Sequence, residues 1–217
     1  EINGYGGECF LFLLVNFKYQ SSILYAILML FKVSIMKYLR MRLLVVMSSI
    51  FFSCVFFSVL MSEWLSPYPL LYFSSLFQTD SFGRNFPLLV FSIFFINMVW
   101  SSFVFVTLPG FAFFPLSSAF LAYRACIWGF LLFHQPTWLL LIAVPTIVLE
   151  GLGYCFAAVA GTVVGVSWIK PEWVYGAENC RVKAFKRALK ECLAVYLYVA
   201  IFLFFSAVVE AATLMIT

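Results

Sequence analysis

Five long stretches of apolar residues constrain this chain more than any other feature of its sequence. They cover about residues 43–61, 86–108, 111–133, 138–168 and 192–216. Only Pro109 and Gly110 separate the second stretch from the third, which predicts a tight helical hairpin with its turn there. Each has roughly the 20 apolar residues that a helix needs to cross about 30 Å of hydrocarbon. The sequence therefore predicts an all-α protein, a polytopic bundle of five transmembrane helices.

The composition excludes the other broad classes. Of the 217 residues, 65% are hydrophobic and 10% are charged. In a soluble domain about 45–50% of the residues are apolar and about 25% are charged. A disordered chain would need few hydrophobic residues and many charged ones. The net charge of +4 does not indicate nucleic acid as a partner, because the basic residues cluster beside the apolar stretches. The lipid bilayer is the expected partner.

The first part of the chain is harder to interpret. A sixth apolar stretch, about 10–31, is interrupted by polar residues and predicts a possible extra N-terminal hydrophobic helix. Met36 and Lys37 begin a segment that looks like a natural protein start. Residues 1–36 are therefore interpreted as an uncertain hydrophobic extension, and residues 37–217 as the five-span transmembrane domain.

The basic residues predict the orientation, because short cytoplasmic loops are rich in Lys and Arg. One group of basic residues precedes the first span, and another lies between the fourth and fifth spans. The members are Lys32, Lys37, Arg40 and Arg42, then Lys170, Arg181, Lys183, Lys186, Arg187 and Lys190. Five spans place both groups on one side. Segments 37–42 and 169–191 are predicted to be cytoplasmic and the C-terminus to lie outside the cell membrane.

The second basic group also predicts a helix. Asn179 can cap it, and apolar residues then recur at helical spacing, at Val182, Phe185, Leu189 and Cys192. The basic residues Arg181, Lys183, Lys186, Arg187 and Lys190 fill the positions between them. Such a helix favours the membrane surface before the fifth span. The alternative is that it docks a soluble partner.

Four polar residues interrupt the predicted spans: Asn97, Arg124, Glu150 and Glu210. Ionisable groups in lipid are costly and usually face the bundle interior. The depths of Arg124 and Glu150 differ by only about 5 Å at 1.5 Å per residue, so an ion pair between them is expected. It either fixes helix packing or lines a path for an ion, a proton or a substrate.

The fourth span carries small residues at every fourth position: Gly153, Ala157, Gly161 and Gly165. This small-residue stripe allows another helix to approach closely. Glu150 is three residues before Gly153 and shares its face. Pro145 predicts a tilt or a break between residues 145 and 153.

Catalytic and metal-binding motifs are absent from the sequence. It has no HExxH, GxSxG or P-loop pattern, and its six cysteines form no CxxC pair. His134, near a predicted outer loop, is the only histidine that could join them. The sequence therefore predicts no enzyme, no catalytic residue, no metal site and no cofactor.

From residue 86 onward, the chain resembles the stage II sporulation protein M family of multi-span membrane proteins. Pro145 and Glu150 match a Pro-His-Gly-x-x-Glu motif, and Ala157, Gly161 and Gly165 follow it as in the family. Residues 207–211 match an Ala-x-x-Glu-Ala-like motif that includes Glu210. Thr146 and Ile147 replace the His and Gly of the first motif.

The resemblance implies a non-catalytic membrane component of a multi-protein complex, such as one that drives peptidoglycan degradation in sporulation. Membrane-protein partners or a homo-oligomer are then expected. The alternative is a transporter or permease subunit that uses the intramembrane Arg/Glu cluster as a path.

Overall fold

The computed structural model describes residues 41–62, 85–133, 137–176 and 180–216. The predicted extension 1–36, with its possible helix at about 10–31, lies outside these residues, as does His134. The chain divides into two compact units, Glu1–Leu43 and Leu44–Thr217. Of the first unit only the helical residues 41–43 are described, and every other described residue belongs to the second unit.

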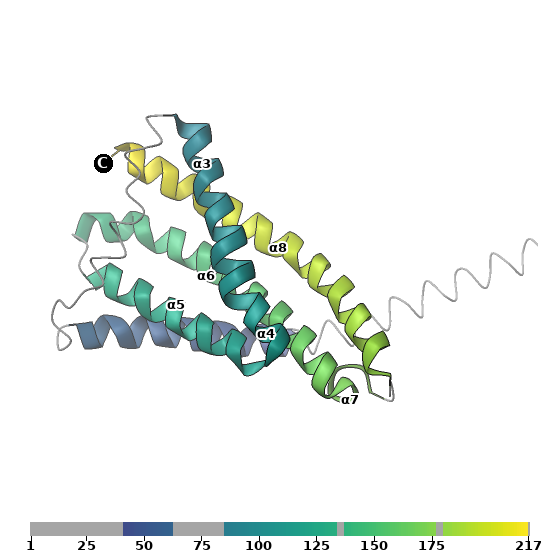
Figure 1. Cartoon of the computed structure of the whole chain (residues 1–217). Coiled ribbons are helices and arrows are strands. Elements are labelled where there is room, and N and C mark those ends of the chain that lie inside the picture. Colours follow the sequence, from purple (N-terminus) through teal and green to yellow (C-terminus); the bar gives the residue numbers. More distant parts are fainter. Residues whose placement is uncertain (1–40, 63–84, 134–136, 177–179, 217) are drawn as a thin grey trace, which may run out of the picture. The chain divides into compact units, whose positions relative to one another are not determined.

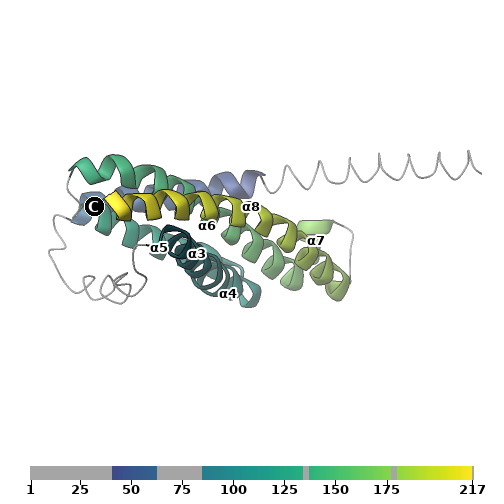
Figure 2. The same cartoon turned by 90° about the horizontal axis from the view of Figure 1, so that it is seen from above.

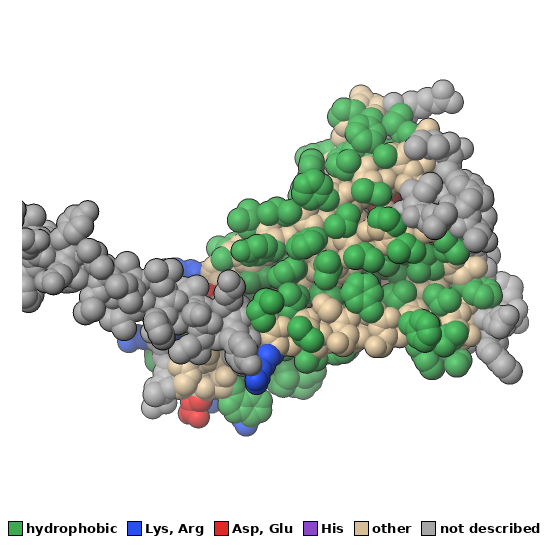
Figure 3. All heavy atoms as spheres, turned by 180° about the vertical axis from the view of Figure 1, so that it is seen from behind, with side chains coloured by type: hydrophobic (Ala, Val, Ile, Leu, Met, Phe, Trp, Pro, Cys, Tyr) green, Lys and Arg blue, Asp and Glu red, His purple; other side chains and the backbone are tan. Residues whose placement is uncertain are grey.

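Within the described ranges every regular element is a helix, and five helical segments are long and apolar enough to span a membrane. They are Met41–Ser62, Phe86–Ala112, Pro115–Phe133, Ala143–Ile169 and Arg181–Met215. The predicted all-α, five-span architecture is therefore confirmed, and the chain is a multi-pass membrane protein. Figure 3 shows the apolar side chains covering one face, with the Lys and Arg side chains gathered at one end.

The helix α6, Thr137–Ile169, is the central element of the bundle. It contacts α8 (Arg181–Ile216), α5 (Pro115–Phe133), α4 (Leu108–Ala112) and η3 (Ile96–Thr107). Residues 150–167 are almost entirely buried. Figures 1 and 2 show α6 running beside α5 and α8, while α3 (Phe86–Phe95) packs against the C-terminal part of α8.

Of the tilt or break predicted for the fourth span, the break is absent, because α6 is one helix with Pro145 inside it. Transmembrane helices tolerate an internal proline. One residue after Pro145, Ser206 Oγ of α8 donates a hydrogen bond of 3.2 Å to the carbonyl of Thr146, which ties this part of α6 to α8.

The turn between the second and third spans also differs from the prediction. Pro109 and Gly110 lie inside α4, and the chain turns instead at Phe113, which has an extended backbone (φ −149°, ψ 111°). Proline is tolerated in the first turn of a helix because that N–H is unpaired in any case. Phe114 precedes Pro115, and a residue before proline is disfavoured in helical conformation.

The second span contains an unusual segment. η3, Ile96–Thr107, is wound as a π-helix of 12 residues, whereas most π-helical segments are single turns. Its buried residues are Asn97, Ser101, Ser102, Val106 and Thr107, spaced by four and five residues rather than by three and four. The wider winding therefore keeps Asn97 and both serines on one buried face.

The basic segment forms the first turns of α8, which is continuous with the fifth span over 36 residues. The buried face runs through Ala184, Ala188 and Cys192, while Val182 is exposed. Of the predicted apolar face, Phe185 packs edge-on against Trp168. At about 1.5 Å per residue, α8 exceeds the hydrocarbon thickness by about 24 Å, so its basic start extends beyond the lipid core.

Candidate functional site

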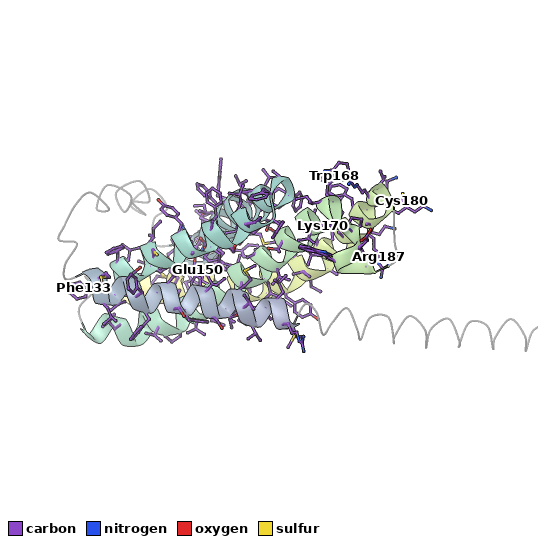
Figure 4. All side chains as sticks on the ribbon, turned by 90° about the horizontal axis from the view of Figure 1, so that it is seen from below. Phe133, Glu150, Trp168, Lys170, Cys180 and Arg187 are labelled. Atoms are coloured by element: carbon purple, nitrogen blue, oxygen red, sulfur yellow. The ribbon has the colours of Figure 1, made fainter. Side chains whose placement is uncertain are left out.

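The intramembrane polar cluster consists of Asn97, Arg124, Glu150 and Tyr154, contributed by η3, α5 and α6. Figure 4 shows Glu150 partway along the bundle, with Phe133 toward one end and Lys170, Cys180 and Arg187 toward the other. The Glu150 side chain is 0% exposed and that of Arg124 31% exposed. The cluster is thus an interior site in the spans.

The predicted ion pair between Arg124 and Glu150 is present. Arg124 Nη2 lies 3.5 Å from Glu150 Oε1, at the long end of a hydrogen bond. Pairing the two opposite charges lowers the free-energy cost of burying each of them within the spans. The pair joins α5 to α6, so it holds the third and fourth spans together.

Tyr154 connects the remaining members of the cluster. Arg124 Nη2 donates a 3.1 Å hydrogen bond to Tyr154 Oη, and the guanidinium carbon lies 5.3 Å from the centroid of the tyrosine ring. The Tyr154 hydroxyl in turn contacts Glu150 Oε1 and Asn97 Oδ1, the latter at 3.2 Å. Tyr154 is four residues after Glu150, so one face of α6 presents both groups.

Asn97 is held by its own π-helical segment. Ser101 Oγ lies 3.5 Å from Asn97 Oδ1, and Ser102 Oγ donates a 2.9 Å hydrogen bond to the carbonyl of Asn97. The second of these bonds spans five residues, the spacing of a π-helix. η3 therefore both orients Asn97 and brings it to Tyr154.

Glu210 is the fourth polar residue predicted from the sequence. It is partly buried on α8. The structure brings the other three, Asn97, Arg124 and Glu150, into one bonded network through Tyr154. Sequence reasoning missed Tyr154 and Ser101, although the i, i+4 spacing of Glu150 and Tyr154 was a usable signal.

The small-residue stripe is occupied by contacts within the chain. Gly153 faces Leu203 of α8, while Gly161 faces Thr107 and Gly165 faces Gly110. The carbonyl of Ala157 accepts a 2.9 Å hydrogen bond from Thr107 Oγ1, whose oxygen lies 2.6 Å from Tyr196 Oη. The stripe therefore packs α6 against η3, α4 and α8 rather than offering a face to another protein.

The basic end of the bundle is organised by a second, smaller network. Tyr175 of α7 (Pro171–Tyr175) donates a 2.8 Å hydrogen bond to Glu191 Oε2, and Arg187 Nε lies 3.3 Å from Glu191 Oε1. The Tyr175 hydrogen bond connects α7 to α8, whereas the Arg187–Glu191 pair lies within α8. The exposed basic residues are Lys170, Arg181, Lys183, Lys186 and Lys190.

These two networks define what the described residues can do chemically. The side chains of the interior cluster can carry charge and make hydrogen bonds. The exposed basic residues at the end of the bundle can contact anionic groups. In the described ranges no three His, Cys, Asp or Glu side chains come together as a metal site would require. No protein-family model, curated protein or solved structure matches this chain.

Proposed function

We propose that this chain is a non-catalytic membrane component of a multi-protein complex, a scaffold in the cell membrane similar to stage II sporulation protein M. The observation that carries the proposal is the burial of Glu150, which is 0% exposed and bonded to Arg124. A carboxylate paired in this way holds helices in place.

The packing of α6 supports the same proposal. Its small residues bring backbones together at Gly161 and Gly165, so the bundle has a tightly packed centre. Because this stripe is used within the chain, partners would contact the outer apolar faces or the basic end. Membrane-protein partners or a second copy of the chain would meet exposed side chains such as Leu193, which is 75% exposed.

The rival function is a transporter or permease subunit. The 31% exposure of the Arg124 side chain favours it, because a polar path to the cluster would need an opening. Transport predicts flux through the cluster, whereas a scaffold predicts flux no greater than in empty vesicles. The two proposals therefore differ in a measurable quantity.

The experiment reconstitutes the full chain in liposomes and measures H⁺, Na⁺ and K⁺ flux with entrapped dyes. If the chain is a scaffold, the wild type, Glu150→Gln and the lipid-facing control Leu193→Ala should all give the flux of empty vesicles. Flux above background that Glu150→Gln abolishes and Leu193→Ala retains would refute the scaffold and support transport.

A second measurement tests the complex directly. Amine-reactive cross-linking in native membranes should join the exposed Lys183, Lys186 or Lys190 to the same partner chain in repeated preparations. Replacing these lysines by Gln should remove the adducts. If only adventitious adducts form, the chain is not a component of a stable complex.

The proposed orientation places Cys180, which is exposed, in the cytoplasm. We expect a membrane-impermeant maleimide to leave Cys180 unlabelled in intact cells and to label it after permeabilisation. The matched control is Asn85→Cys in a cysteine-free background, because Asn85 is exposed before α3 at the opposite end. Labelling of Cys180 from outside intact cells would reverse the topology.

A further inference from the structure

The first turns of α8 carry a row of lysines on one face. Lys183, Lys186 and Lys190 follow one another at intervals of three and four residues, so they lie side by side along the helix surface. All three are exposed, whereas Ala184 and Ala188 on the opposite side of the helix are buried. This lysine stripe therefore faces away from the rest of the bundle.

The face that carries the lysine stripe continues into the apolar part of α8. Leu193 lies three residues after Lys190, and Leu197 and Ile201 follow at intervals of four residues. These three apolar side chains are exposed on the protein surface, and within a membrane span such side chains contact lipid. Because α8 is one uninterrupted helix, the lysine stripe borders the same lipids at the level of their headgroups.

An aromatic contact gives the depth of the lysine stripe. Trp168, exposed at the end of α6, packs edge-on against Phe185 of α8, with ring centroids 5.5 Å apart. Figure 4 shows Trp168 at the same end of the bundle as Lys170 and Arg187. Exposed tryptophans at span ends lie at headgroup level. The three lysines begin within about 8 Å of Phe185 along the helix axis at 1.5 Å per residue, and their flexible stems extend the reach of the amines.

The charge of this region favours an anionic occupant. Residues 181–191 contain five basic side chains and one acidic side chain, Glu191. Glu191 accepts a hydrogen bond from Tyr175 and pairs with Arg187, so its carboxylate is directed to those groups. Lysine is a compact cation that suits phosphate. A basic cluster of this size on a helix at the membrane surface is typical of anionic-lipid recognition.

We propose that the lysine stripe binds the headgroups of anionic phospholipids and selects them over zwitterionic ones, which carry a phosphate but no net charge. A soluble acidic protein fits the stripe less well, because it would approach from water, whereas the stripe continues into the lipid-facing surface. The inference does not rest on the proposed scaffold function. The purified chain alone should show the preference, whereas cross-linking to a partner in native membranes tests the scaffold.

The test places a bimane fluorophore at Leu193→Cys in an otherwise cysteine-free full chain, reconstituted in phosphatidylcholine vesicles. A lipid with a nitroxide near the top of one acyl chain quenches the fluorophore on contact. Spin-labelled phosphatidylglycerol and spin-labelled phosphatidylcholine are compared at equal mole fractions. We expect the anionic lipid to quench more strongly, and the difference to fall at about 1 M NaCl, where the Debye length is about 3 Å.

Two double variants with the same change in charge locate the effect. Lys186→Gln with Lys190→Gln should lower the preference for the anionic lipid by at least about fivefold, the contribution of one lysine at an anionic surface. Lys170→Gln with Arg181→Gln removes two charges away from the stripe, because Lys170 stacks on Trp173 and Arg181 lies about half a turn around α8. This variant should nearly keep the preference, as should Lys186→Arg with Lys190→Arg.

Three results would overturn the proposal. Equal quenching of the wild type by the two lipids means that the stripe does not select anionic headgroups and is open to a soluble partner. Equal losses in the two glutamine double variants assign the preference to overall charge. Displacement of the lipid by glycerol phosphate at constant ionic strength means that free phosphate is the ligand. Circular dichroism checks the fold of each variant, and the wild-type salt dependence needs no variant of the stripe.

Discussion

Replacing Arg124 by leucine should destabilise the protein more than any other single change to the polar cluster. The variant leaves Glu150 buried without its cation and removes the donor that Tyr154 accepts from. Breaking a buried ion pair from one side costs about 3–5 kcal/mol. We expect that loss in denaturant unfolding of the purified protein, together with reduced accumulation in membranes.

Two further variants separate a charge effect from a general effect of substitution. Arg124→Leu with Glu150→Leu should recover much of the stability, because the double change leaves no unpaired charge between α5 and α6. Arg187→Leu removes the partly exposed pair with Glu191 and should cost about 1 kcal/mol or less. If Arg124→Leu is as stable as Arg187→Leu, the interior pair does not hold the helices together.

The second large effect is expected at Gly165, where α6 meets α4. A methyl group there would lie 3.2 Å from Gly110 C and from Phe114 Cα, and closer still to the Gly110 carbonyl oxygen. Backbone atoms cannot rotate away as a side chain can, so Gly165→Ala must separate the helices. Overpacking of this kind costs about 1–3 kcal/mol, measured as a lower midpoint of unfolding.

Gly153→Ala is the matched control for this prediction. Its added methyl would lie 2.9 Å from Leu203 Cδ2, the far end of a flexible side chain that can move. The better helix propensity of alanine, about 1 kcal/mol over glycine, offsets part of the clash. Equal losses for the two variants would contradict the distinction between backbone and side-chain contacts.

Much of the architecture can be predicted from local sequence properties. Apolar length alone identifies the spans, since a helix that crosses lipid must be long and apolar whatever it packs against. The same reasoning failed at the ends of elements. Pro109 and Gly110 suggested a turn, but proline at the start of α4 is compatible with a helix, and the turn lies at Phe113.

The candidate site was predictable in part. Arg124, Glu150 and Asn97 are conspicuous because polar groups in lipid need partners, and their similar depth predicted the ion pair. Tyr154 was overlooked because a tyrosine in an apolar span is unremarkable by composition. Its role depends on Asn97, 57 residues earlier in the chain, and no local pattern shows that contact.

The π-helical winding of η3 could not be predicted from the segment itself. Read at α-helical spacing, Asn97, Ser101, Val106 and Thr107 do not share one face. In the structure they do, because hydrogen bonds five residues apart, together with the Thr107 contacts to α6 and α8, stabilise a wider helix. A contact of this kind is made by the assembled bundle and is not encoded in the segment alone.

Local composition is enough to establish that the chain spans a membrane with five helices, because burying apolar length in lipid needs no knowledge of the neighbouring helices. It also establishes which charges must find partners. The assembled bundle alone selects those partners: α6 becomes central, its small-residue stripe is used within the chain, and Tyr154 joins Arg124 to Asn97. These outcomes depend on distances between segments remote in sequence, and only packing sets those distances.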